Sequence, residues 1–319
     1  MKLIAQEIIY MIPILYITQF LIIACWAIGY KGHRWWFFDL FSHFKVQYVV
    51  GSALILAGGF YFEVPFLPIF SYIFLMIILL TSRLMSEIFA FKKINKTKDL
   101  SSTVTLMSFN VWKENRNCAA TIAHISHTQP DIVGLYETSV IWEKALNSLK
   151  NIYPHQIFYP GEGRFGMTIL SKYPFVETDL PQNNPQRVIV GSVTIPTSGK
   201  ALHIYAFHPY SPEGKRDALT RNRQLREMER WVFQNTDLPM VVMGDFNATP
   251  WSYPLKSILK RHKLIPTKPH KCGTWPSLLG EFGIPIDHIL TKNVVANKNG
   301  HIGPHLGSDH RPVHAKITL

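Results

Sequence analysis

The sequence has few cysteines and lacks the glycine and histidine signatures of several enzyme classes. Three cysteines in 319 residues, without Cys-x-x-Cys spacing, exclude a cysteine-rich zinc site and a disulfide framework. Cys25 falls in an apolar run, and a single bridge between Cys118 and Cys272 stays open as the alternative to free thiols. There is no Gly-x-Gly-x-x-Gly and no Walker loop, so the nucleotide-binding folds lack their phosphate cradle. None of the 14 histidines shows His-Glu-x-x-His spacing, which disfavours a zinc hydrolase.

Acidic side chains are also scarce. There are 21 Asp and Glu residues against 33 Lys and Arg, giving a net charge of +12 and an isoelectric point near 9.5. This balance favours a partner that carries phosphates, either nucleic acid or anionic lipid. The charge alone does not choose between them, because many basic residues flank apolar segments, where they commonly set membrane topology.

Long apolar runs are confined to the first part of the chain. Residues 8–30 carry no charged side chain, which is enough helix to cross the roughly 30 Å hydrocarbon core of a bilayer. Residues 46–62 and 64–81 form two further runs near the lower length limit for a span, and they predict a tight hairpin. We therefore predict a membrane region over residues 1–100, with three transmembrane helices and a basic linker. A buried helical pair in a soluble core is the alternative, but no polar outer surface accompanies these runs.

The charges around these runs bear on sidedness. Basic residues follow the first and third runs, whereas the short loop between the second and third offers only Glu63. By the positive-inside rule this pattern places the C-terminal domain in the cytoplasm. Lys2 alone argues for the opposite orientation.

Residues 101–319 have a different pattern, in which short β-rich runs alternate with helical stretches. Residues 213–234 repeat apolar positions at helical spacing and predict a helix whose charges form a solvated face. Weaker helices are predicted at 117–127 and 139–149. Many strands with intervening helices indicate an α/β fold, a layered α/β sandwich. The predicted strands are 104–109, 132–136, 152–159, 167–170, 188–195, 202–207, 240–243, 286–290 and 313–317.

Polar side chains of few types stand at the ends of six of these strands. The most informative segment is Gly244-Asp245-Phe246-Asn247, which sets a carboxylate and a carboxamide two residues apart after an apolar run. Alone this segment also makes ordinary turns. The whole set is hard to explain by structure alone; it comprises Asn110, Glu137, His208, Asp245 with Asn247, Asp287, and Asp309 with His310.

These residue types suit hydrolysis at a phosphate. A hard divalent cation prefers carboxylate and carboxamide oxygens, as Asn110, Glu137 and Asp309 offer, and the predicted ion is Mg²⁺ with Mn²⁺ as the alternative. Asp245 is predicted to orient or deprotonate an attacking water, while Asn247 and His208 donate to phosphoryl oxygens. Asp287 is predicted to hold the ring of His310 in one tautomer. His288 follows Asp287 and should point to the opposite face of its strand, while His203, His301, His305 and His314 have no partner that the sequence reveals.

The order of these motifs closely resembles the endonuclease/exonuclease/phosphatase superfamily, also called the deoxyribonuclease-I-like fold, over residues from about 103 to 319. The resemblance implies a four-layered α/β sandwich and a Mg²⁺-dependent phosphoesterase, an enzyme. It implies that Asn110, Glu137 and Asp309 surround the metal and that Asp287 pairs with His310. It further implies that His208, Asp245 and Asn247 attend the phosphate and the water.

Finer motifs resemble a bacterial membrane-anchored subgroup with three N-terminal spans. They are Asn247-Ala248-Thr249-Pro250-Trp251-Ser252, Gly273-Thr274-Trp275-Pro276, Ile284-Pro285-Ile286-Asp287-His288 and Gly307-Ser308-Asp309-His310-Arg311-Pro312. That subgroup includes proteins linked to teicoplanin resistance, which are thought to act as lipid-pyrophosphate phosphatases outside the membrane. The resemblance therefore implies a multi-pass protein of the bacterial inner membrane with an extracytoplasmic catalytic domain, in contrast to the positive-inside rule.

The sequence leaves three candidate functions. The first is a membrane-anchored phosphatase or phosphodiesterase whose partners are the lipid bilayer and a phosphorylated lipid substrate. The second is a membrane-tethered nuclease, disfavoured because basic residues are scattered rather than forming a nucleic-acid track. The third is a non-enzymatic binding module, against which the complete metal and histidine set argues. The sequence does not decide the oligomeric state or which phosphate bond is cleaved.

Overall fold

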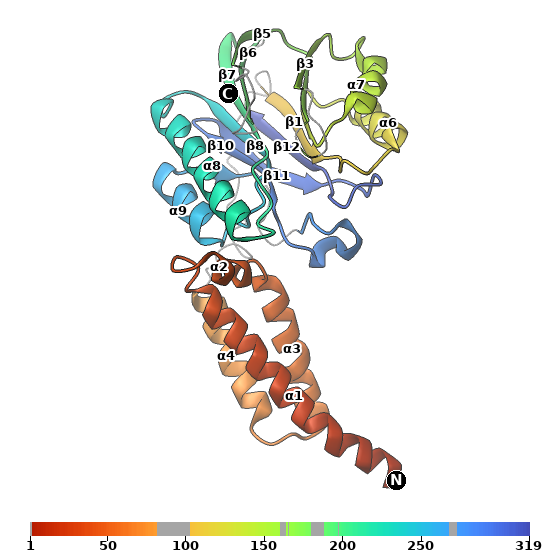
Figure 1. Cartoon of the computed structure of the whole chain (residues 1–319), viewed down its shortest axis with the longest axis vertical. Helices are drawn as coiled ribbons and strands as arrows, with labels where there is room; N and C mark the ends of the chain where they lie inside the picture. The colour runs from red at the N-terminus through yellow and green to blue at the C-terminus, as the bar shows by residue number, and fades with distance from the viewer. Residues whose placement is uncertain are drawn as a thin grey trace. The chain divides into compact units, whose positions relative to one another are not determined.

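The computed structural model describes residues 2–81, 103–159, 164, 166–179, 188–196, 198–267 and 273–319. Two compact units make up the chain, an N-terminal helical unit and a C-terminal α/β unit (Figure 1). The predicted basic linker and Cys272 lie outside the described residues. Cys118 is a buried free thiol and Cys25 is a half-buried one.

The N-terminal unit consists of four helices: α1 (Lys2–Gly29), α2 (Trp36–Ser42), α3 (Lys45–Tyr61) and α4 (Leu67–Thr81). Within α1, the segment Tyr10–Gly29 is long and apolar enough to cross a membrane. The helices α2 and α3 are bent by 56° relative to each other, so they count as a second candidate only if taken together as one broken span. The apolar part of α4 is shorter, at Leu67–Leu80.

In the part of the chain that it describes, the structure therefore contains fewer helices that are long enough to span a membrane than the three that the sequence predicts. Helices form at all three apolar runs, but α3 has 17 residues and α4 has 15. At about 1.5 Å per residue these helices rise roughly 26 and 23 Å, short of a 30 Å hydrocarbon core. The turn between them explains the shortening, because Glu63 and Phe66 take positive φ values of 51° and 55°, which an α-helix does not accommodate. Within the described residues, one helix meets the length requirement, or two if the bent pair is one span.

A buried polar contact joins three helices of this unit. Gln19 on α1 donates from Nε2 to Ser52 Oγ on α3 (3.3 Å), and Ser71 Oγ on α4 donates to Gln19 Oε1 (3.2 Å). All three side chains are almost fully buried. Large apolar side chains instead face outward, among them Leu54, Phe60, Phe20 and Leu80.

The C-terminal unit contains two six-stranded mixed sheets. In the first sheet the order is β11 (Val295–Ile302), β12 (Val313–Thr318), β1 (Thr103–Asn110), β2 (Ile132–Tyr136), β4 (Met167–Ser171) and β3 (His155–Tyr159). In the second it is β5 (Phe175–Asp179), β6 (Val188–Ile195), β7 (Lys200–Phe207), β8 (Met240–Asp245), β10 (Asp287–Lys292) and β9 (Ile265–Pro266). The pairs β1–β2 and β7–β8 are parallel and the other pairs are antiparallel.

The sheets pack face to face through alternate apolar side chains, such as Leu106 and Ile317 from the first sheet and Ile204 and Val241 from the second. The opposite face of the first sheet is covered by α6 (Cys118–Thr128) and α7 (Val140–Leu146), and that of the second by α8 (Lys215–Gln234) and α9 (Tyr253–His262). Figure 1 shows these helix pairs on opposite sides of the strands. The predicted α/β sandwich is therefore confirmed, with helices on both outer faces.

Each predicted strand is present, with boundary shifts of up to three residues, and the predicted helix at 213–234 is α8. The prediction missed β5, β9, β11 and α9. The strand β11 begins Val295-Ala296-Asn297-Lys298-Asn299-Gly300, which has little β propensity. Its pairing with β12 supplies the hydrogen bonds that define it, so local sequence could not reveal it.

Candidate active site

The predicted strand-end residues meet at one edge of the two packed sheets. Asn110 ends β1 and pairs in register with Tyr136, the last residue of β2, so that Glu137 follows directly beside it. Asp287 begins β10 opposite Asp245, the last residue of β8. Strand pairing within each sheet, followed by packing between the sheets, thus gathers side chains that are far apart in sequence.

Asn110 links the two sheets at this edge. Its side-chain amide donates from Nδ2 to Glu137 Oε1 and to Asp245 Oδ2, both at 3.1 Å. Its Oδ1 accepts the backbone N–H of Trp112 (3.0 Å), and the backbone N–H of Lys113 donates to Glu137 Oε2 (3.0 Å). The last residue of β1 therefore orients both carboxylates, and the turn after β1 adds a second donor to Glu137.

The two candidate histidines stand against the same carboxylates. His208 Nε2 lies 3.6 Å from Asp245 Oδ2 and 3.7 Å from Glu137 Oε1. His310 shares a hydrogen bond between Nδ1 and Asp287 Oδ2 (2.9 Å), and its Nε2 lies 3.6 Å from Asp245 Oδ2. The structure thus brings the predicted Asp287–His310 pair together and leaves Nε2 of His310 facing the centre of the cluster.

Asn247 takes a structural position beside Asp245. Its backbone N–H donates to Asp245 Oδ1 (2.8 Å), and its Nδ2 donates to Pro209 O (3.1 Å) and weakly to Asp245 Oδ2 (3.4 Å). Its φ of 48° turns the chain sharply after β8. Gly244 has a φ of 155°, and a Cβ there would lie 1.8 Å from Phe207 O, so only glycine allows β7 and β8 to approach so closely at this end.

Asp309 occupies the outer side of the cluster. Trp275 Nε1 donates to its Oδ2 (3.0 Å), and its Oδ1 lies 4.0 Å from His310 Nε2. This Oδ1 atom is buried without a hydrogen-bond partner. Asp309 is also the most exposed of the candidate carboxylates, with 37% of its side chain accessible, so it borders solvent.

Burial and mutual charge perturb the pKa values of the cluster. Burial, reinforced by Asp287 and opposed by His310, raises the pKa of Asp245 to about 7. Burial alone would lower the pKa of His310, but the carboxylates of Asp287 and Asp245 outweigh it and raise that pKa to about 10. Burial acts to raise the pKa of Glu137, but His208 and the donors from Lys113 and Asn110 keep it below its usual value. The site therefore combines an imidazole whose pKa is raised, a glutamate whose pKa is lowered and a carboxyl group whose pKa is raised toward neutrality.

The donor set fits a hard divalent cation. The buried Oδ1 of Asp309, which has no hydrogen-bond partner, and the carboxylate of Glu137 offer oxygen ligands of the kind that such a cation prefers. A second group, Asp245, Asp287 and His310, has ligand atoms within 4.8 Å of one another. We favour the oxygen group, because Nδ1 of His310 is already hydrogen-bonded to Asp287. The amide nitrogen of Asn110 points toward the two carboxylates and its Oδ1 accepts the N–H of Trp112, and its role as a metal ligand stays a prediction.

Helix α8 supplies supporting contacts that the sequence did not reveal. Arg221, predicted to lie on a solvated face, is fully buried and donates from Nη1 to Asn247 O (3.0 Å). Gln224 Oε1 accepts the backbone N–H of Tyr210 (2.9 Å), two residues after His208. The helical spacing of Arg221 and Gln224 can be read from the sequence. The loops to which these two side chains bond come next to α8 only when the unit folds.

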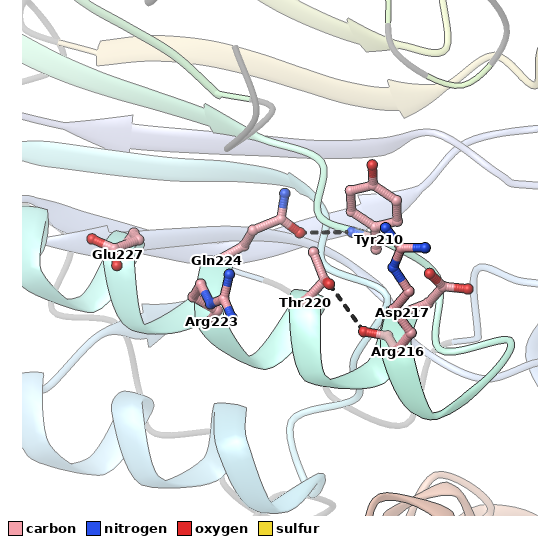
Figure 2. Close-up of a pocket in the computed structure, with 7 residues that line it drawn as sticks. All are labelled: Tyr210, Arg216, Asp217, Thr220, Arg223, Gln224 and Glu227. Carbon is pink, nitrogen blue, oxygen red and sulfur yellow. Dashed lines mark hydrogen bonds between the residues drawn. The ribbon is translucent and has the colours of Figure 1, made fainter.

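A groove of about 600 Å³ runs along α8, and Tyr210 and Gln224, which share one of these contacts, belong to its lining (Figure 2). Its lining pairs two arginines, Arg216 and Arg223, with two acids, Asp217 and Glu227. No strand-end candidate lines it, and its charges balance, so we place the chemistry at the strand ends. Arg164 forms an ion pair with Glu213.

Comparisons with known proteins place this fold and motif set. Residues 107–310 match the model of the Endonuclease/Exonuclease/phosphatase family. No curated protein matches the chain. Similar solved structures include a humanised Danio rerio TDP2 (17% identity, TM-score 0.55, 68% of this chain and 100% of that chain) and an endonuclease/exonuclease/phosphatase from Beutenbergia cavernae (20%, 0.54, 68% and 72%). A third is a mutant of the beta toxin of Staphylococcus aureus with bound magnesium ions (19%, 0.50, 66% and 98%). At these identities the structures show a shared fold.

The family match covers more than half of the chain, so the protein belongs to the endonuclease/exonuclease/phosphatase family and is a metal-dependent hydrolase of phosphate ester bonds.

Proposed function

We propose that this protein hydrolyses a phosphate ester or pyrophosphate bond of a lipid, with the strand-end cluster as its reaction centre. The observation that carries the proposal is the convergence of Glu137, Asp245, Asp287 and His310 at one edge of the fold, where the pKa values of Glu137, Asp245 and His310 are shifted. Such a convergence of shifted carboxyl and imidazole groups is typical of an acid–base site.

Asp245 acts on the attacking water. A pKa near 7 lets this carboxylate accept a proton at neutral pH, and the N–H of Asn247 holds its Oδ1 while Oδ2 faces the two histidines. Asn247 therefore acts here by fixing Asp245, in addition to the predicted donation to phosphate.

His310 and His208 stabilise the negative charge that develops on phosphoryl oxygens. Asp287 holds Nδ1 of His310 and keeps the ring protonated, so Nε2 can donate toward the reacting phosphate. His208 stands on the other side of Asp245 and offers a second imidazole to the same space.

Glu137 and Asp309 would hold a divalent cation, which would supply Lewis-acid polarisation of the phosphoryl oxygen. Mg²⁺ is the ion that their oxygen donors favour, with Mn²⁺ as the alternative. Asn110 belongs to this group if its amide rotates to present the oxygen.

An exposed apolar strip beside the site favours a lipid substrate over a nucleic acid. The strip consists of Trp275, Leu278, Leu279 and Phe282, which expose 37%, 89%, 54% and 62% of their surface. Ser277 in its middle donates from its backbone N–H to Asp309 O (2.7 Å), and Trp275 donates to the Asp309 carboxylate. Contiguous exposed apolar side chains mark contact surfaces for lipid or protein, whereas a nucleic-acid track would carry basic residues there.

The N-terminal unit is proposed to anchor the enzyme in a membrane. Its support is the apolar α1, the outward apolar side chains and the inward Gln19 contact, a distribution suited to a lipid surrounding. We retain three membrane-embedded helices over residues 1–100 ahead of the catalytic domain at 101–319, with α3 and α4 as a short hairpin. The resemblance to the membrane-anchored phosphatase subgroup favours an extracytoplasmic catalytic domain, and cysteine labelling on both sides of intact cells tests it.

The test is phosphate release by the detergent-solubilised protein with Mg²⁺, comparing undecaprenyl pyrophosphate with a short DNA and with an EDTA control. We expect EDTA-sensitive release from the lipid. The variant with Leu278→Ser and Phe282→Ser should raise KM for the lipid and leave hydrolysis of a small soluble phosphate ester unchanged. Val176→Ser, which changes a similarly exposed apolar residue on β5, is the matched control.

A tethered nuclease is the second candidate, motivated by the net positive charge. Cleavage of DNA with an inert lipid would replace the lipid proposal with this one. Absence of both activities, with the fold intact, would instead favour a binding module.

A further inference from the structure

Three histidines from three different elements meet on the outer face of the first sheet. His124 lies on α6, His301 on β11 and His314 on β12. Val313 and Ala315, on either side of His314, face the core between the sheets, so His314 points to the side that α6 covers. His301 is paired directly with His314 across the strands and therefore projects from the same face.

Two of the rings, those of His124 and His314, are close enough to share a ligand. The Nε2 atoms of His124 and His314 lie 2.9 Å apart, and their rings meet at 72°. The ring of His301 stacks on that of His314, with centroids 4.9 Å apart and planes inclined by 8°. His314 is buried, His124 is half-buried and His301 is exposed, so the group opens to solvent on one side.

Burial and neighbouring imidazoles favour the neutral form of His124 and His314. Burial and the neighbouring His124 and His301 lower the pKa of His314 to about 3, and burial with His127 and His301 also lowers the pKa of His124. A neutral imidazole carries one unprotonated ring nitrogen, which is the form that binds transition metals. Two nitrogens bound to one tetrahedral zinc at about 2.0–2.1 Å lie roughly 3.3 Å apart, so His124 and His314 need to separate by only a few tenths of an ångström.

We propose that His124, His314 and His301 form a second metal site, specific for a nitrogen-preferring transition-metal cation of the Zn²⁺ class. His124 and His314 are already placed for one ion, and His301 joins them when its ring turns from its stacked position. Solvent completes the coordination on the open side. The site differs from the reaction centre in chemistry, because its donors are all imidazoles rather than carboxylates.

The expected role of the ion is to fasten α6 to the β11–β12 pair. The strand β11 has weak β propensity and lies at the edge of its sheet. A bond from His301 to an ion held by His124 would therefore add a contact between β11 and α6. The alternative to a metal site is a hydrogen bond between the imidazoles of His124 and His314, with the ring of His301 stacked on that of His314. Metal binding distinguishes the two.

The experiment is a titration of the full chain in detergent with Co²⁺ alone, followed by visible absorption and by equilibrium dialysis. We expect two classes of bound ion, one with the intense visible bands of a nitrogen-rich site of low coordination number. His124→Ala and His301→Ala should each weaken that class by at least about tenfold, because even outer-shell changes cost 10–100-fold in metal affinity. Asp309→Ala should leave it unchanged and weaken only the other class.

His155→Ala is the matched control, since it removes a histidine of the same sheet on β3. His314→Gln repeats the test at the buried position, and circular dichroism checks that each variant folds. Zn²⁺ should raise the melting temperature of the wild type and of His155→Ala but not of His124→Ala. Unchanged Co²⁺ stoichiometry and affinity in both His124→Ala and His301→Ala would overturn the proposal.

Discussion

Both units of this protein bury polar side chains, but these side chains have different roles in the two units. In the N-terminal unit Gln19, Ser52 and Ser71 form a neutral contact in which each amide or hydroxyl group meets a partner. In the C-terminal unit Asp245, Asp287 and His310 form a cluster of ionisable groups, in which burial and neighbouring charges shift the pKa values of Asp245 and His310. A neutral, satisfied contact orients helices, whereas a charged, perturbed cluster is costly to fold and is retained for chemistry. The difference predicts which substitutions affect activity and which affect only stability.

The largest expected effect is on activity. Asp245→Asn removes the proton acceptor while keeping nearly the same shape, and we expect a fall in kcat of about 10²–10⁴-fold. The free energy of unfolding should stay the same or rise, because a buried ionisable group is removed. Kinetic assays together with denaturant unfolding measure both quantities. Retained activity would show that the charged cluster is structural, like the Gln19 contact.

The apolar core between the sheets should respond in the opposite way. Ile204→Ala leaves a cavity at a fully buried position and should lower the free energy of unfolding by about 2–5 kcal/mol. Leu54→Ala on α3, where 69% of the side chain is exposed, should change it by less than about 0.5 kcal/mol. Urea titration in detergent compares the two variants. Equal costs would mean that Leu54 is packed in the folded protein.

The histidine cluster on the first sheet predicts a pH effect on stability. The pKa of His314 in the folded state, about 3, lies below its unfolded value near 6.5, so unfolded chains bind the proton first as pH falls. Stability is therefore unaffected above pH 6.5 and decreases below it, by up to about 1.4 kcal/mol per pH unit until pH 3.

His314→Gln in the presence of EDTA should reduce this slope relative to the wild type, which thermal unfolding between pH 7 and 4.5 measures. Identical slopes in the two proteins would mean that His314 protonates without cost in the folded state.

The smallest effect is expected in the N-terminal unit. Gln19→Leu removes a neutral amide that joins three helices and should lower stability by about 1 kcal/mol, as for other hydrogen bonds between membrane helices. Phosphate release from the substrate should be unchanged per folded molecule. A loss of activity larger than the loss of folded protein would contradict a purely structural role for this contact.

Much of the fold was predictable because its signals are local. Apolar runs bounded by turns located β1, β2, β6, β7, β8 and β12, and helical spacing located α8. The strands β5, β9 and β11 were missed because their pairing with neighbours, and not their composition, makes them strands. The burial of Arg221 was missed for a related reason, since Asn247 O, which it binds, is 26 residues away.

By itself the sequence determined the chemistry that this protein can offer. The residue types at its strand ends specify carboxylates, amides and imidazoles in an order that identifies the family, and its first helix is apolar enough to enter a membrane. Only the tertiary structure decided which of these groups meet, which way the Asn110 amide faces, and that His124, His301 and His314 come together. The sequence sets the identity of the side chain at each position. Distances of about 3 Å between remote residues exist only after strands pair into sheets and the sheets pack.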